Sequence, residues 1–210
     1  MNSKEITDLI IAFQAVITLF ISLRAFYLYS KTRSDTLFIV GLSMAVIGLG
    51  GISGLIGDYL ITSSSFNTFW FRYIGQTVSY LFIFFISLPG AERHVRSLKR
   101  WNLTATAFLL ALLLLTPVLP PIPGTALTEG LSGARGVVCL AIFLNYYFVI
   151  YGAKGTRFSF LMCAAFLLIA AGIAVYTLKF SVPNPLPYDY VGDSTRALGL
   201  VLMLAAFFVG

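Results

Sequence analysis

Three arginines stand at nearly constant spacing along this chain, and their chemistry is the strongest functional signal in the sequence. Arg72, Arg135 and Arg196 are 63 and 61 residues apart. The planar guanidinium group of arginine binds a carboxylate or a phosphate through two parallel hydrogen bonds. If the three side chains converge, they predict a pocket that accepts a small anion or the anionic head of an amphiphile.

Carboxylates close to these arginines allow a second interpretation. Asp58 and Arg72 flank a short connection and are expected to form an ion pair, and Asp193 lies three residues before Arg196. The charged residues of this group are Arg72, Arg135, Lys179, Arg196, Asp58, Glu129, Asp189 and Asp193. They could neutralise one another as a structural network, with long side chains reaching lipid phosphates. The candidate ligand-binding residues are Arg72, Arg135, Arg196, Asp58, Asp193 and Gln76. Neutral hydrogen bonds deeper in the pocket are expected from Gln76, Tyr80, Asn145, Tyr176 and Thr195.

Residue types that support catalysis or metal binding are scarce. The single histidine, His94, lies in a basic loop, and the two cysteines are predicted at depths that differ by roughly 13 Å, too far apart for a disulfide. No serine, cysteine or lysine stands beside a general base, and no carboxylate pair has the spacing of a metal site. We therefore expect no enzyme activity, no metal and no cofactor.

Composition identifies the elements that must position these residues. Hydrophobic residues make up 59% of the 210 residues, charged residues 10%, and the mean hydropathy is +0.91. A bilayer core about 30 Å thick requires about 20 apolar residues per spanning helix. Seven such stretches cover almost the whole chain, at residues 6–29, 37–62, 67–88, 103–119, 131–151, 158–180 and 191–210. The predicted fold is an all-α bundle of seven transmembrane helices that forms a single domain, residues 1–210.

The basic residues predict how this bundle is oriented. Nine lysines and arginines belong to the first, third and fifth connections, and five to the opposite side. Basic loops stay cytoplasmic, so the N-terminus is expected outside and the C-terminus inside. The net charge of +6 then reports topology and attraction to anionic lipids. Nucleic acid is not an expected partner, because the basic residues are scattered over short loops.

The second span is rich in glycine. Gly50 and Gly54 lie four residues apart on one helical face, where small residues let another backbone approach closely. This face is expected to serve packing within the chain. The alternatives are a homodimer, a protein partner or a flat lipid ligand on the same face.

Two short matches resemble the microbial opsins. Arg72-Tyr73 resembles the arginine-tyrosine pair at the outer start of the third opsin helix, and Asp193 to Arg196 with Gly199-Leu200 resembles the last opsin helix. The resemblance implies seven helices with the N-terminus outside. However, Ala197 stands where that family has the lysine that binds retinal, and Gly75 replaces the counter-ion carboxylate. The sequence therefore argues against retinal.

In length, orientation and its aromatic third helix, the chain also resembles seven-helix input domains of histidine kinases. This resemblance implies a sensory or receptor-like domain in a prokaryotic plasma membrane. The chain stops at Gly210 inside its last apolar run, as if a soluble output domain had been removed or lay beyond this sequence. The ligand of the receptor-like domain would be a small anionic or amphiphilic molecule on the outer side. The alternatives are a non-catalytic accessory subunit of a larger membrane complex and a small-solute transporter. Transport is disfavoured because no carboxylate lies in the middle of a span.

Overall fold

A computed structural model describes residues 3–59, 68–120, 124–152 and 155–209, without the side chains of residues 3–4, 58–59 and 124–125. Seven long helices account for most of these residues. They are α1 (Ser3–Thr32), α2 (Asp35–Tyr59), α3 (Phe69–Ser87), α4 (Val95–Leu114), α5 (Gly124–Asn145), α7 (Arg157–Leu178) and α8 (Leu186–Val209). A π-helical segment, η2 (Tyr146–Tyr151), continues α5, and two 3-10 turns, η1 (Ala91–Arg93) and η3 (Lys179–Ser181), follow α3 and α7. The described part of the chain contains no strand, which confirms the all-α prediction.

Six of these helices are long and apolar enough to cross a membrane. They are α1, α2, α3, α5 with its π-helical continuation, α7 and α8. The remaining helix, α4, carries Arg96, Lys99 and Arg100 in its first two turns, which lowers its hydropathy. The composition of the helices supports a membrane protein, whereas the orientation of the bundle stays a prediction.

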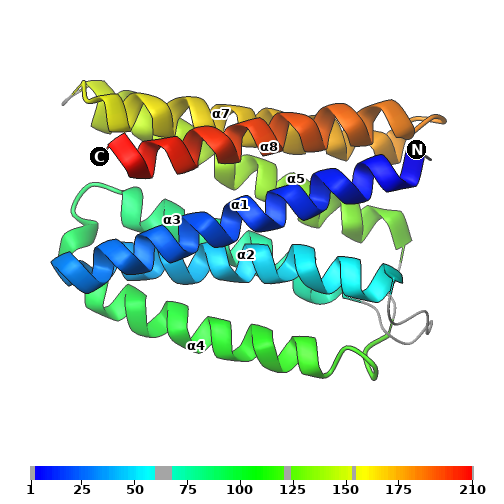
Figure 1. Ribbon diagram of the computed structural model, residues 1–210, viewed down its shortest axis with the longest axis horizontal. Coiled ribbons are helices and arrows are strands. Elements are labelled where there is room, and N and C mark those ends of the chain that lie inside the picture. Colours follow the sequence, from blue (N-terminus) through cyan, green and yellow to red (C-terminus); the bar gives the residue numbers. More distant parts are fainter. Residues whose placement is uncertain (1–2, 60–67, 121–123, 153–154, 210) are drawn as a thin grey trace.

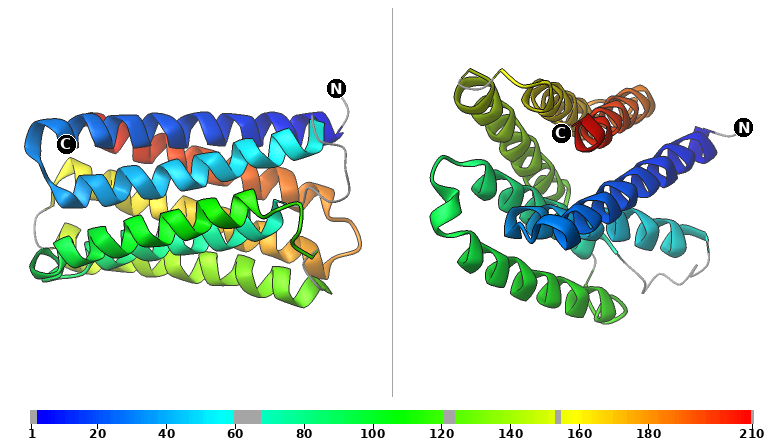
Figure 2. Two further views of the ribbon diagram at one scale, coloured as in Figure 1. Left: turned by 90° about the horizontal axis from the view of Figure 1, so that it is seen from below. Right: turned by 60° about the vertical axis from the view of Figure 1, so that its left-hand side comes forward.

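The six apolar helices form a closed ring. Each one packs against its two neighbours in the order α1, α2, α3, α5, α7 and α8, and α8 returns to α1. The fourth long helix, α4, lies outside this ring against α2 and α3 (Figure 1). The start of α1 and the end of α8 lie at opposite ends of the bundle (Figure 1), and the right-hand view of Figure 2 shows α4 at its edge. The ring encloses one main apolar core, which holds Met44, Tyr80, Phe166 and Met203.

Several helices begin earlier than the hydropathy pattern predicted. The fourth helix begins at Val95 instead of residue 103, because its polar first turns pack on the bundle. Asn102 is 2% exposed and donates a hydrogen bond to Ser43 of α2 at 3.3 Å. Likewise α5 begins at Gly124 and α8 at Leu186, so helix occupies part of the connections that the predicted spans left at 120–130 and 181–190.

Glycines bring α7 and α8 into close contact. A Cβ atom added at Gly172 would lie 2.6 Å from the Gly192 carbonyl oxygen and 2.6 Å from Cγ of Arg196. A Cβ at Gly199 would lie 2.8 Å from the Ala165 carbonyl oxygen. This contact sets where α8 presents Arg196.

The glycine face of α2 also packs within the chain. A Cβ added at Gly54 would lie 2.8 Å from the Arg72 guanidinium, and one at Gly50 would lie 3.8 Å from the Arg72 Cα atom. In this structure α3 therefore covers the face on which a homodimer or a protein partner was the alternative expectation.

Candidate functional site

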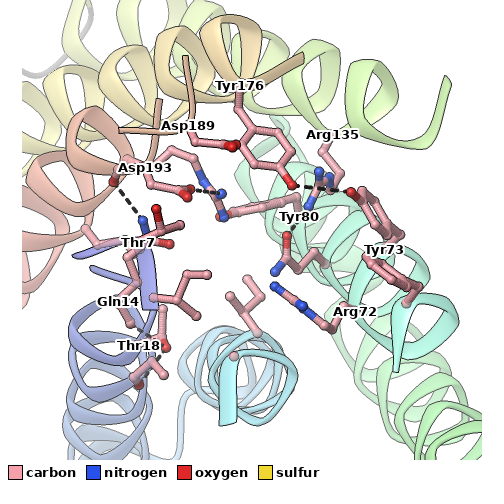
Figure 3. Close-up of a pocket in the computed structure, with 18 of the residues that line it drawn as sticks. Thr7, Gln14, Thr18, Arg72, Tyr73, Tyr80, Arg135, Tyr176, Asp189 and Asp193 are labelled. Carbon is pink, nitrogen blue, oxygen red and sulfur yellow. Dashed lines mark hydrogen bonds and ion pairs between the residues drawn. The ribbon is translucent and has the colours of Figure 1, made fainter. Parts of the chain in front are cut away.

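A cavity of about 230 Å³ lies inside the ring, at the end of the bundle where α1 begins. Its walls come from the first halves of α1, α3, α5 and α8 and from the last turns of α2 and α7 (Figure 3). Five of the six predicted ligand-binding residues line it, namely Arg72, Arg135, Arg196, Gln76 and Asp193. The side chain of the sixth, Asp58, lies outside the described residues, as does the expected ion pair between Asp58 and Arg72.

Arg135 is a buried cation of the cavity, and no described carboxylate pairs with it. Its side chain from α5 is 4% exposed. The guanidinium donates hydrogen bonds to the side-chain oxygen of Gln76 and, at 3.0 Å, to the Ser132 hydroxyl. Its central carbon lies 4.6 Å from the centre of the Tyr73 ring. The Nε atom is buried without a hydrogen-bond partner, and no ion pair joins Arg135 to any described residue.

Arg196 occupies the same cavity but has an internal counter-ion. Its guanidinium contacts the Asp193 carboxylate, one helical turn earlier on α8, at 2.8 Å. Asp193 is 2% exposed, and its backbone oxygen accepts a hydrogen bond from Gln14 of α1 at 2.7 Å. The pair is thus held between α8 and α1. Within the Arg196 guanidinium, as in that of Arg135, the Nε atom is buried without a hydrogen-bond partner.

The wall nearer the ends of α7 and α8 carries a second ion pair and aromatic contacts. The Lys179 ammonium lies 2.9 Å from Asp189 and 3.8 Å from the centre of the Tyr176 ring. The hydroxyl of Tyr176 lies 3.5 Å from that of Tyr73 and links α7 to α3 (Figure 3). Lys179 and Asp189 therefore neutralise each other's charge.

Arg72 lines the cavity from the first turn of α3. Its side chain is half-buried, and its guanidinium packs against the backbone of Gly54. Among the described residues it forms no ion pair.

The charge network expected from the sequence is therefore formed only in part. Two of its cations pair with carboxylates, Lys179 with Asp189 and Arg196 with Asp193. Glu129 lines a separate apolar groove between α5 and α7, not the cavity. Carboxylates of the chain thus neutralise the charges of Lys179 and Arg196. No described carboxylate neutralises the charge of Arg135.

The predicted neutral hydrogen-bond donors divide into two groups. Gln76, Tyr80 and Tyr176 line the cavity. Asn145 does not, because its amide donates to the Ser87 carbonyl oxygen at 2.5 Å, towards the other end of α3. Thr195 is partly buried and donates to the carbonyl oxygen of Val191 at 2.6 Å. The prediction was wrong for these two, since helix direction and depth alone do not decide which face enters the ring.

Sequence reasoning missed the contribution of the first helix. Thr7, Gln14 and Thr18 of α1 all line the cavity (Figure 3). They lie seven and four residues apart, which places them on one helical face. That polar stripe in an otherwise apolar span was the available signal.

Comparison of the chain with protein-family models, curated proteins and solved structures found no match. The resemblances to microbial opsins and to kinase input domains stay predictions.

Proposed function

We propose that this protein is a receptor-like integral membrane protein that binds a small anion in the cavity inside its helix ring. One observation carries the proposal, which is the buried Arg135 guanidinium without a carboxylate partner among the described residues. A buried charge is costly unless it is paired, and charges inside membrane spans mark functional sites. An anion from solution would supply the missing counter-ion.

The placement of the cavity supports a receptor-like role. Its lining comes from all six helices of the ring. An anion held by Arg135 of α5 and Arg196 of α8 would contact helices that are not neighbours in the ring. A ligand shifts a conformational equilibrium when it binds two states with different affinity. Binding at this position can therefore change how the two sides of the ring pack.

Anion-dependent stabilisation tests the binding site. The purified protein is titrated with sodium acetate, benzoate, phosphate and sulfate at constant ionic strength, and its Tm is measured. We expect at least one anion to raise the Tm of the wild-type protein, and the rise to be absent in Arg135→Met. The control Arg157→Met removes an exposed arginine at the start of α7, far from the cavity, and should respond like the wild type. No response to any of these anions, or an equal response in Arg135→Met, would overturn the proposal.

A distance measurement tests the receptor-like role separately. Spin labels are placed at Thr32→Cys on α1 and Phe208→Cys on α8, both exposed at the end opposite the cavity, in a protein with Cys139 and Cys163 replaced by alanine. The saturating anion should change the distance distribution between the labels. If the anion binds but the distance distribution does not change, the anion site stands and the receptor-like role is wrong.

A further inference from the structure

The cavity has two chemically different sides. Guanidinium groups and phenol hydroxyls come from α3, α5, α7 and α8. The lining residues of α1 and α2 include an apolar group, namely Ile11, Ala15, Ile47 and Gly51, and Leu200 of α8 adds to it. An inorganic anion would use only the cationic side. A ligand that satisfies both sides carries an anionic group and an apolar body.

The charges of the cavity favour a ligand with one negative charge. Lys179 and Arg196 are already neutralised by Asp189 and Asp193. Two described arginines of the cavity form no ion pair, and of these Arg135 is buried whereas Arg72 is half-buried, nearer the start of its helix. The buried charge to be neutralised is therefore that of Arg135. One carboxylate would neutralise it, whereas a doubly charged phosphate or sulfate would bury an additional negative charge, which is costly.

The free hydrogen-bonding groups match a carboxylate as well. The Nε atoms of Arg135 and Arg196 are both buried without partners. The terminal nitrogens of Arg135 already contact Gln76 and Ser132, and one terminal nitrogen of Arg196 contacts Asp193. A carboxylate has two oxygens and at least four acceptor positions, so it can accept from the N–H groups of both guanidiniums that these contacts leave free.

The size of the cavity limits the apolar body. Its volume is about 230 Å³. An engineered apolar cavity of about 150 Å³ in another protein binds benzene. The present cavity therefore has room for one six-membered ring together with a carboxylate group, and no room for a long acyl chain.

We propose, building on the anion site above, that the ligand is a small organic monocarboxylate with an apolar body about the size of one ring. Its carboxylate binds the Arg135 guanidinium beside Arg196, and its body lies against Ile11, Ala15 and Ile47. The ligand class is thus defined by charge, size and apolar surface together.

A panel of defined anions tests this ligand class on the full chain in lipid nanodiscs, by isothermal titration calorimetry at constant ionic strength. Benzoate and cyclohexanecarboxylate should bind at least about tenfold more tightly than acetate, because their rings bury apolar surface. Phosphate and sulfate should bind more weakly than acetate. Benzamide has the shape of benzoate without its charge, and should not bind above the level measured with empty nanodiscs.

A variant that fills the apolar side tests the placement of the ring. Ile11→Trp should weaken benzoate binding at least about tenfold and leave acetate binding within about twofold, because Arg135 is untouched. The matched control Val16→Trp enlarges a residue of α1 that is 51% exposed and faces away from the cavity, and it should bind both anions normally. If Ile11→Trp does not fold, Ala15→Leu at the same wall is used in its place, with the same expectation.

The two proposals fail in different ways. Tighter binding of phosphate or sulfate than of carboxylates, or equal binding of acetate and benzoate, would overturn the ligand class and keep the anion site. No heat from any anion of the panel would overturn both.

Discussion

At the scale of single residues, the contrast between Arg135 and Arg196 is the central feature of the cavity. Each arginine contacts a polar residue three positions earlier on its own helix, but that residue is Asp193 for Arg196 and Ser132 for Arg135. A carboxylate neutralises the guanidinium and a hydroxyl does not. The residue three positions before each arginine thus decides whether its charge is neutralised within the helix or is available to an external anion.

The substitution Ser132→Asp should close the site by supplying an internal counter-ion. Ser132 is fully buried and lies 3.0 Å from the Arg135 guanidinium, so an aspartate there is within reach of the charge. We expect the apparent anion affinity, obtained from the rise in Tm during titration, to be at least about tenfold weaker in this variant. The reason is that the new carboxylate would repel the bound anion. Ser132→Asn is the control, because asparagine has nearly the shape of aspartate without its charge. This variant should keep the anion-dependent rise in Tm. A Ser132→Asp protein that binds anions like the wild type would show that Arg135 does not hold them.

A second residue-scale prediction concerns the opposite end of the bundle. Lys99 of α4 precedes the apolar part of its helix and lies 2.6 Å from Asp35 of α2. The pKa of Lys99 is raised above the ordinary lysine value, first by its hydrogen bond to Asp35 and then by that to Tyr29. Because the pKa of Lys99 is higher in the folded than in the unfolded protein, protonated Lys99 stabilises the fold. This contribution is complete below the unfolded pKa of about 10.4, and it is lost as the pH rises through the higher folded pKa.

Asp35→Asn should therefore lower the Tm by about 1–2 °C at pH 8, a modest effect because both side chains are partly exposed. The difference from the wild type should shrink as the pH rises above the unfolded lysine value, about 10.4, and Lys99 loses its proton. Tm measured across this range checks it. Glu92→Gln, which removes an exposed carboxylate of η1, is the control. A difference that stays constant as the pH rises well above the unfolded lysine value would show that the pair does not act through the Lys99 charge.

Many residues of the site were predictable from the sequence, and there are physical reasons why their contacts were not. Charged residues in apolar spans are rare, so Arg72, Arg135, Arg196 and Asp193 could be selected by residue type alone. Which of them are paired was not predictable, because pairing depends on the rotation of each helix about its axis. Asn145 and Thr195 illustrate this, since both have suitable chemistry but contact other atoms.

At the scale of helices, the close contact of α7 and α8 determines how rigidly the cavity is built. Gly172 and Gly192 face each other at the level of Arg196, and no side chain separates the two backbones. Small residues at such contacts let membrane helices pack without a hydrophobic driving force. We infer that α7 and α8 behave as one unit against the rest of the ring.

Gly172→Ala should destabilise the protein by about 1–3 kcal/mol, because the new methyl group would overlap the Gly192 backbone. Gly133→Ala on α5 is a matched control, since a Cβ there meets nothing within 4 Å. That control should be neutral or stabilising by up to about 1 kcal/mol, as expected for alanine in a helix. Reversible unfolding in mixed micelles measures both variants. Equal stability of Gly172→Ala and the wild type would indicate that the two helices are free to move apart.

Helix positions were predictable where hydropathy changes sharply and uncertain where it does not. The first two helices lie close to the predicted spans, with bounds that differ by a few residues. The fourth was displaced, because a helix that packs on other helices continues through polar turns such as those around Lys99 and Asn102. The π-helical continuation of α5, Tyr146–Tyr151, has no hydropathy signal, since an extra residue in a turn leaves composition unchanged.

At the scale of the whole molecule, the order of helices in the ring was not predictable from the sequence. Short connections favour neighbours, which accounts for the contacts of α1 with α2 and of α2 with α3. The contacts of α3 with α5 and of α8 with α1 bring distant segments together, and they leave α4 outside. Such contacts depend on the matching of whole helix surfaces, which composition does not describe.

The orientation of the whole bundle is testable by cysteine labelling in intact cells. Asn184→Cys lies in the exposed connection between η3 and α8 at the cavity end, and Glu92→Cys lies in η1 at the other end. With Cys139 and Cys163 replaced, a membrane-impermeant maleimide should label Asn184→Cys directly and Glu92→Cys only after permeabilisation. The reverse pattern would place the cavity on the cytoplasmic side, and the basic-loop count would then have misled the prediction.

The closure of the ring between its first and last helices also governs how the protein is made. Gln14 reaches the backbone of Asp193 and Arg24 reaches that of Phe207, contacts that join residues 179 and 183 positions apart. At about 5–20 residues per second, a ribosome needs roughly 10–35 s to add the partner segment. During that interval the Gln14 side chain of α1 lacks its Asp193 partner. The cavity is therefore closed only after α8 has been synthesised, and a bound anion would report that the entire ring has been assembled.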